Sequence, residues 1–290
     1  HRDLHSFPTR RSSDLPEQYA IRLVDYYYQQ DLYAWYKTKP TGPAGKPVRP
    51  DITNREIVAA RLRSQEERDN YLAGNTINWV DEVLRIAPIQ NYNLSASGRT
   101  DRSNYYVSGS YTNEQGIQLN DEYGRITLYS NIESKITNWL TVGFNSSYTF
   151  RDYSGIEASL SEARECSPLA NNKIGSPNYD MYLTGEAYMT YPLIGLYVDH
   201  VDKRNDLLMI GNAKVTVPWI KGLTYEFNYS NRFYNRTYNR FYPSTTPDGS
   251  GNKGLAVKNP SDERNWIYNN IVTYLRTFGN HQVNATLLYS

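Results

Sequence analysis

The stretch RITLYSNIESKITNWLTVGFNSSYTF, residues 125–150, decides the fold of this chain. Apolar side chains fall at most of the even-numbered positions on both sides of a short polar break at 137–138: Ile126, Leu128, Ile132, Ile136, Leu140, Val142, Phe144, Tyr148 and Phe150. Successive side chains of a strand point to opposite faces, so a period of two gives one apolar and one polar face. The stretch therefore predicts two strands joined by a tight turn.

The same period recurs over most of the chain from residue 91 onward. We predict eight strands, at about 91–98, 105–111, 125–136, 139–150, 207–217, 223–233, 265–277 and 282–290. Short connections (99–104, 137–138, 218–222 and 278–281) alternate with long ones (112–124, 151–206 and 234–264). Tight turns at one end and long polar loops at the other are typical of bacterial outer-membrane barrels.

The length of the strands also favours a membrane barrel. Several predicted strands have about 11–13 residues, against a mode of about 5–6 in globular proteins, and such strands can cross a bilayer when tilted. We predict an all-β, antiparallel, up-and-down transmembrane β-barrel, with Thr141 and Asn145 facing the lumen. The residues predicted to face lipid are Val142, Phe144, Tyr225 and Phe227. A soluble antiparallel barrel or sandwich also has alternating strands, but it explains neither the loop asymmetry nor the strand length.

The segment before residue 91 divides into two parts. Residues 1–15 (HRDLHSFPTRRSSDL) lack the apolar run of a signal peptide. They resemble a translated sequencing-library adapter, so we interpret them as a non-native scar, with a disordered native N-terminus as the alternative. Residues 16–90 are predicted to be a linker or insert with short helices, one of them capped by Asn54 and running through Asn70. Residues 91–290 are predicted to form a partial transmembrane barrel.

Composition excludes several classes of protein. The 31 Lys and Arg balance 30 Asp and Glu, for a formal net charge of +1, whereas nucleic-acid binders normally carry a basic excess. The single cysteine, Cys166, excludes a disulfide framework. No run of about 20 apolar residues could form a transmembrane helix.

No catalytic, cofactor or metal motif stands out. His200 and His281 show no metal-ligand spacing, and we interpret both as solvated. The stretch 248–252 faintly resembles a calcium loop, but Asn259 stands where that loop needs a bidentate Glu. Carboxylate pairs such as Glu162 and Glu165 occur in any polar loop and identify no hydrolase. We therefore predict no catalytic residues, no cofactor and no metal, and we do not expect an enzyme.

Aromatic residues concentrate in the two longest predicted loops. A tyrosine combines a flat apolar face with a polar tip, which suits stacking on sugar rings or packing on peptides. The alternative is that these rings pack the loops against each other. Together with the balanced charge, the loop composition favours a neutral polar ligand. The candidate residues of a ligand vestibule are Tyr179, Tyr182, Tyr188, Tyr191, Tyr197, Phe241 and Tyr242.

Several motifs resemble those of SusC/RagA-type TonB-dependent outer-membrane receptors of Bacteroidota. They are NYNLSASG (91–98), NYYVSGSYTNEQGI (104–117), RITLYSNIESKITNWLTVGFNSSYT (125–149) and NWIYNNIVTYLRTFGNHQVNATLLYS (265–290). Upstream, NTINWVDEVLRIAPIQ (75–90) is similar to the family's Asn-Thr-Asp-Trp-x-Asp-Glu stretch. Here Ile77 and Asn78 replace the usual single Asp before Trp79. The resemblance covers roughly half of the chain.

The resemblance implies a fold, a location and partners. The family has a 22-stranded barrel closed by a plug domain, so this chain would hold about eight early strands of the larger barrel. Such receptors lie in the outer membrane of Gram-negative bacteria, in contact with its lipid. They import glycans, oligosaccharides or peptides, with a SusD-like lipoprotein as lid and with energy from the TonB complex through the plug region. The rival interpretations are a soluble glycan-binding β-domain and a small structural outer-membrane barrel.

Overall fold

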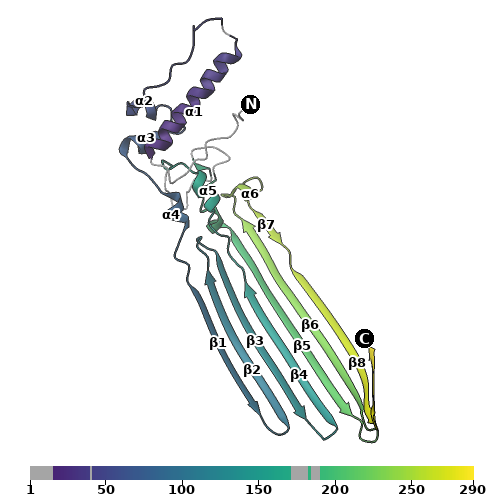
Figure 1. The fold of residues 1–290 in the computed structure, drawn as a ribbon. Coiled ribbons are helices and arrows are strands. Elements are labelled where there is room, and N and C mark those ends of the chain that lie inside the picture. Colours follow the sequence, from purple (N-terminus) through teal and green to yellow (C-terminus); the bar gives the residue numbers. More distant parts are fainter. Residues whose placement is uncertain (1–15, 40, 171–181, 184–189) are drawn as a thin grey trace.

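The dominant feature of the structure is one antiparallel sheet. The computed structural model describes residues 16–39, 41–170, 182–183 and 190–290, so the predicted scar at 1–15 lies outside the described residues. The strands follow the order β1-β2-β3-β4-β5-β6-β8-β9, and the short β7 pairs with β6 (Figure 1). Their bounds are β1 Ile89–Arg99, β2 Ser103–Gln115, β3 Glu122–Lys135, β4 Leu140–Asp152, β5 Asp199–Thr216, β6 Leu223–Tyr242, β7 Leu255–Lys258, β8 Ser261–Phe278 and β9 His281–Tyr289.

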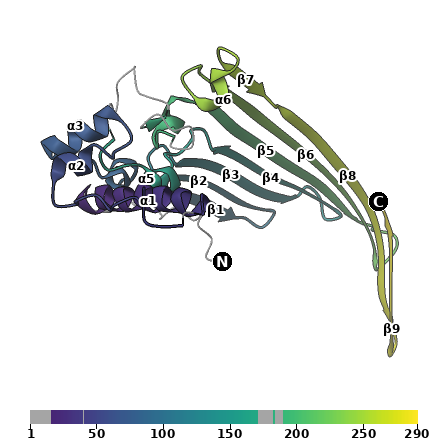
Figure 2. The ribbon, with the colours of Figure 1, turned by 90° about the horizontal axis from the view of Figure 1, so that it is seen from above.

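The sheet is an open, curved wall. Each long strand pairs with the next long strand along the chain, and β1 and β9 form the two edges. Seen from above, the strands follow an arc (Figure 2). The all-β, antiparallel, up-and-down architecture predicted from the sequence is confirmed. None of the helices in the described residues is long and apolar enough to cross a membrane.

The strand register separates two chemically different faces, with the weakest contrast on β8, where Ile267, Ile271 and Leu275 share the more polar face. Directly opposed residues of neighbouring strands lie on the same face. One such row runs across seven strands and is mostly aromatic or aliphatic: Gly98, Tyr105, Ile132, Phe144, Gly211, Tyr229 and Tyr268. The adjacent row on the other face is polar: Arg99, Asn104, Glu133, Gly143, Asn212, Asn228 and Asn269. We call these the apolar face and the polar face.

The apolar face is open to the surroundings. Leu94 is 81% exposed, Leu128 51% and Leu287 69%. On β4, the apolar side chains run from Leu140 to Phe150, which is about 33 Å along a strand that rises about 3.3 Å per residue. With the strand tilt of about 40° common in barrels, this band is about 25 Å tall, the height of the lipid-facing band of outer-membrane barrels.

Two central strands are longer than the sequence pattern predicts. β5 begins at Asp199 rather than 207, and β6 ends at Tyr242 rather than 233. Apart from Val201 and Phe241, these extensions are polar or carry tyrosine on both faces, so hydrophobic alternation does not reveal them. They pair residue by residue from Asp199↔Phe241 to Asp206↔Tyr234.

The connections at one end are correspondingly shorter than predicted. Only 153–198 separates β4 from β5, and 116–121 separates β2 from β3. The connection from β6 to β8 is 243–260, and it contains β7 and the short helix α6, Pro247–Ser250. The tight connections at the other end (100–102, 136–139, 217–222 and 279–280) stay short, so the asymmetry is retained for 153–198 and 243–260; the long connection predicted between β2 and β3 is wrong, because 116–121 is no longer than 217–222.

The helices form a separate unit, which we call the helical cap. It comprises α1 Pro16–Lys37, α2 Arg55–Ala59, α3 Gln65–Ala73, α4 Trp79–Val83, α5 Leu160–Glu165 and a 3-10 turn at Ile194–Tyr197. The single helix predicted from Asn54 through Asn70 is wrong. Asn54 caps the short α2, and Ser64 begins a new helix, where it forms a reciprocal capping box with Glu67. The cap lies beyond the ends of the strands (Figure 1).

The cap has two hydrophobic cores of its own. One joins α1 to α2, α3 and Leu169, and Tyr19 at its centre donates a 2.9 Å hydrogen bond to the buried Glu67. The other joins α4 to α5 and to the residues before β5, around Trp79 and Tyr191. The cap is therefore built from two distant chain segments, one before β1 and one between β4 and β5.

Candidate functional site

The helical cap and the long connections gather at the same end of the sheet, which we call the mouth (Figure 1). The polar face of the sheet leads up to it. The candidate site consists of this mouth, the polar strand ends below it and the cap above it.

Trp79 fixes the two segments of the cap to each other. Its side chain is fully buried, and its Nε1 donates a 2.9 Å hydrogen bond to the carbonyl oxygen of Ser167. The Tyr191 ring meets the Trp79 ring edge to face at 5.7 Å between centroids. The backbone N–H of Ile77 also donates to the carbonyl of Pro168 at 2.9 Å. The Asn-Trp stretch around residue 79 thus anchors the connection between β4 and β5.

Arg85 fixes the cap to the sheet. Its guanidinium donates to the carbonyl oxygens of Gly116 at 3.1 Å and Asp121 at 2.7 Å, and to the Glu122 carboxylate at 3.2 Å. All three acceptors lie in or beside the turn between β2 and β3. Because one side chain makes all these contacts, the orientation of α4 is tied to the rim of the sheet.

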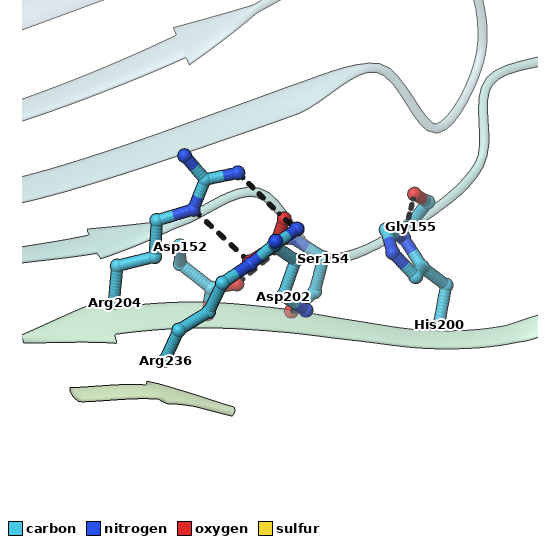
Figure 3. Close-up of polar contacts among 7 residues, drawn as sticks. All are labelled: Asp152, Ser154, Gly155, His200, Asp202, Arg204 and Arg236. Atoms are coloured by element: carbon cyan, nitrogen blue, oxygen red, sulfur yellow. Dashed lines mark hydrogen bonds and ion pairs between the residues drawn. The ribbon is translucent and has the colours of Figure 1, made fainter. Parts of the chain in front are cut away.

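Asp202 is the electrostatic centre of the polar strand ends. Its side chain is 6% exposed and lies between two guanidinium groups, those of Arg204 and Arg236 (Figure 3). Each arginine forms two hydrogen bonds to the carboxylate, at 3.1 and 2.8 Å from Arg204 and at 2.9 and 2.7 Å from Arg236. Asp202 lies beyond the apolar band. The hydrogen bond from Arg236 is the main cause that holds the pKa of its carboxyl well below the usual range. Asp202 stays ionised at any physiological pH.

The backbone around Asp202 is joined to the first residues of the connection after β4. The N–H of Tyr153 donates to the Asp202 carbonyl at 2.8 Å, and the N–H of Asp202 donates to the Ser154 hydroxyl at 3.2 Å. His200 Nδ1 lies 2.6 Å from the carbonyl oxygen of Gly155 (Figure 3). The mouth end of β5 is therefore held rigidly against β4.

The candidate vestibule aromatics lie in different environments. Tyr179 and Tyr188 lie outside the described residues. Tyr182 is half-buried and bridges to Thr190. Tyr191 is buried in the core of the cap, and the half-buried Tyr197 packs against that core. At least these last two rings pack the loop, so Tyr191 in particular offers no face to a ligand.

Phe241 and Tyr242 were expected in a loop, and this expectation is wrong, since both lie at the end of β6. The reason is the strand extension, which their polar neighbours conceal. The strand places them on opposite faces: Phe241 is exposed on the apolar side, whereas Tyr242 accepts a 2.9 Å hydrogen bond from Arg240 on the polar side. Of these two residues, Tyr242 is the one placed to line the mouth.

The four residues expected to face lipid share one face. Val142 and Phe227 both pair with Ala213, and Tyr225 pairs with Val215. Phe144 lies in the aromatic row described above and is 43% exposed. The register thus places all four on the apolar face, and their contact with lipid stays a prediction.

The remaining titratable groups assemble no reaction centre in the described part of the chain. Glu162 and Glu165 both lie on α5, where burial first and Glu165 second raise the pKa of Glu162. Cys166 is buried, with its Sγ 3.6 Å from the carbonyl oxygen of Thr190. Among the described residues, no group of three or more His, Cys, Asp or Glu could hold a metal ion.

The polar network around Asp202 was missed by the sequence reasoning. Its signal was present as charges on one face: Asp202, Arg204 and Asp206 at every second position of one strand, and Arg232 and Arg236 at every fourth position of the next. A period of two in charged residues indicates a strand as much as a period of two in apolar residues does.

Comparison with known proteins supports the same architecture. No family model matches the chain. It is 27% identical over 240 residues to TonB-dependent receptor P3 of Formosa agariphila. This alignment covers 78% of this chain and 24% of that protein. It is 25% identical to TonB-dependent receptor P26 of the same organism, over 72% of this chain and 21% of that protein. The chain thus spans less than a quarter of the length of these relatives.

Solved structures show a similar fold. The RagAB peptide transporter matches with a TM-score of 0.62 at 19% identity, over 96% of this chain and 33% of that chain. The RagAB peptide importer in its 'open-open' state matches with a TM-score of 0.62 at 19% identity, over 89% of this chain and 30% of that chain. These findings confirm the resemblance to SusC/RagA-type TonB-dependent receptors and the barrel fold class.

Proposed function

We propose that this chain forms part of the wall and the mouth of an outer-membrane nutrient import receptor of the SusC/RagA type. In this proposal the receptor takes up glycans, oligosaccharides or peptides, works with a SusD-like lipoprotein over its mouth and draws energy from the TonB complex. The similarity to two TonB-dependent receptors and to the RagAB fold supports the proposal.

The observation that carries the proposal is the difference between the two faces of the sheet. The apolar face carries exposed side chains such as Leu94 and Leu287 over a band about as tall as a bilayer core. A soluble domain would have to cover such a face, because exposed apolar patches on soluble monomers seldom exceed a few hundred Å². Lipid on the apolar face and water on the polar face satisfy both faces at once.

The mechanism follows from the two ends of the sheet. Long connections of outer-membrane barrels lie outside the cell and short turns lie in the periplasm, so the mouth and cap would face the exterior. Ligand would first meet the cap and the polar strand ends, where the lipoprotein would also bind. It would then pass along the polar face into the lumen. The cap therefore takes part in capture, and the polar face in passage.

The test removes the loop while keeping the wall. In the full receptor, residues 156–197 are replaced by a short Gly-Ser linker, which preserves the pairing of β4 with β5 and of β5 with β6. We expect a heat-modifiable barrel in the outer membrane and a sharp loss of TonB-dependent uptake. A second variant, Trp79→Ala, keeps residues 156–197 and only loosens the packing of the cap. It therefore distinguishes the effect of losing the loop from the effect of loosening the cap. Normal insertion with unchanged uptake in the deletion variant would contradict the role in capture.

A further inference from the structure

The polar face carries a transverse row of four arginines just below the mouth. Arg125 on β3 is directly opposed to Arg151 on β4, which is opposed to Arg204 on β5, which in turn is opposed to Arg236 on β6. Neighbouring strands lie about 4.8 Å apart, so the row is about 14 Å wide. Like charges directly opposed across a sheet are destabilising. The row therefore costs folding stability unless anions compensate it.

A column of alternating arginine and tyrosine crosses this row along β6. Residues two apart on a strand share a face, so the polar side of β6 carries Arg232, Tyr234, Arg236, Tyr238, Arg240 and Tyr242. The guanidinium of Arg236 lies 4.7 Å from the Tyr238 ring centroid. On β5, Arg204 similarly lies 4.4 Å from the ring of Tyr153. Row and column together present planar cations interleaved with flat rings.

The carboxylates of the described chain neutralise only some of the arginines on this surface. Asp202 holds Arg204 and Arg236, and Asp206 holds Arg232. Two members of the row remain: Arg151 interacts electrostatically with Asp206 but has no described carboxylate within 4 Å, and the hydrogen bond of Arg125 within the described chain goes to the Thr112 hydroxyl, at 3.4 Å. Two guanidinium groups without a close ion pair among the described residues thus lie side by side on the polar face.

A second observation lies one step closer to the mouth. Arg240 on β6 is directly opposed to His200 on β5. Arg240 Nε and His200 Nε2 are both buried, and within the described chain neither has a hydrogen-bond partner. A guanidinium N–H is only a donor, and a buried donor without an acceptor is costly. Because His200 Nδ1 lies at the carbonyl oxygen of Gly155, Nε2 is the acceptor of this imidazole, and it belongs to the residue directly opposed to the Arg240 donor, so this pair calls for no ligand of its own.

We propose that the arginine row and the arginine–tyrosine column form a binding surface for an anionic oligosaccharide, one whose sugar rings carry carboxylate or sulfate groups. This inference rests on the proposed function and names its substrate class. Guanidinium groups match planar or tetrahedral oxyanions with paired hydrogen bonds, and tyrosine faces suit sugar rings. A neutral ligand was expected from the balanced net charge, but that balance averages over both faces and both ends of the chain.

The position of the surface favours a sugar over a peptide. Extended peptides commonly bind by adding a strand to a free sheet edge. Strands β3, β4, β5 and β6 are interior strands, paired on both sides. Their backbone groups are therefore already used, and a ligand can meet only side chains. Rings and charged groups are what this surface offers.

The test compares ligands that differ only in charge. Isomaltotetraose and its sulfated form share one backbone, and tetraglutamate supplies a peptide of similar charge. For the purified full-length receptor, we expect at least tenfold tighter binding of the sulfated sugar than of either other ligand. This preference should shrink as ionic strength rises, because salt screens exposed charges. The salt measurement uses the unaltered receptor and does not depend on the folding of a variant.

The variants locate the effect on the row. The double variant Arg125→Gln, Arg151→Gln should bind sulfated isomaltotetraose about tenfold more weakly, which corresponds to about 1.4 kcal/mol. It should bind the unsulfated sugar unchanged. Neither arginine forms a close ion pair with a described carboxylate, so folding should change little. The matched control is Arg264→Gln, which changes an arginine on the apolar face that packs over Phe233.

Four results would overturn the proposal. They are equal binding of the sulfated and unsulfated sugars, tetraglutamate bound as tightly as the sulfated sugar, the same loss in the Arg264→Gln control, and a double variant that becomes leaky while its ligand preference is unchanged. The last result would assign the row to holding a lumen-filling segment of the receptor. A receptor that binds the sulfated sugar as expected but shows no TonB-dependent uptake would instead contradict the proposed function alone.

Discussion

The helical cap and the sheet treat apolar side chains in opposite ways. In the cap, Trp79, Val83 and Val24 are fully buried in two cores. In the sheet, side chains of the same kind are turned outward, and Leu94 is 81% exposed. One region of the chain thus buries its apolar side chains in cores, and the other exposes them on one face of a sheet. In the proposed receptor, the boundary between water and lipid would lie between the two regions.

The comparison also shows where the buried ion pairs lie. In the strand ends that extend beyond the apolar band, Asp202 binds Arg204 and Arg236. Paired and partly buried charges hold these strands together where no apolar band contributes. The β5 and β6 extensions therefore act as a rigid collar between the wall and the cap.

The largest effect should come from the cap. Trp79→Ala removes a fully buried indole and its hydrogen bond to Ser167, which should lower the free energy of opening the cap by about 3–5 kcal/mol. Hydrogen exchange in α4 and α5 should rise accordingly, while the heat-modifiable mobility of the barrel stays the same. The control, Trp219→Ala, removes an indole that is 82% exposed at the opposite end, and it should leave cap exchange unchanged. Loss of the barrel in Trp79→Ala would show that the two regions are not separate folding units.

A smaller, graded effect should come from the wall. The apolar band of β4 runs from Leu140 to Phe150, so Phe144 lies nearer its middle than Val142 does. In the full receptor, Phe144→Lys should reduce the free energy of unfolding in bilayers by about 2–4 kcal/mol. Val142→Lys should reduce it by less, because the cost of a lysine falls with distance from the bilayer midplane. Thr141→Lys, on the polar face, should cost far less than either. Equal tolerance of the three in a folding titration would contradict the assignment of the faces.

The sequence alone predicts the wall better than the mouth. Strands such as 139–150 are visible because apolar residues recur with a period of two. The extensions 199–206 and 234–242 are invisible to that test because both of their faces are mostly polar. The cap is invisible for another reason: the hydrogen bond from Trp79 reaches Ser167, which lies 88 residues away in sequence. No local pattern encodes such a contact, so Tyr191 could not be recognised as a core residue.

The central claim is that the apolar face meets lipid, and adjacent residues of β4 test it most directly. In a Cys166→Ser background, Phe144→Cys and Asn145→Cys receptors are each labelled with a small fluorophore and reconstituted in bilayers that contain lipids brominated along the acyl chains. We predict strong quenching at 144 and weak quenching at 145, because neighbouring residues of a strand point to opposite faces. Equal quenching at the two positions, or stronger quenching at 145, would contradict the claim.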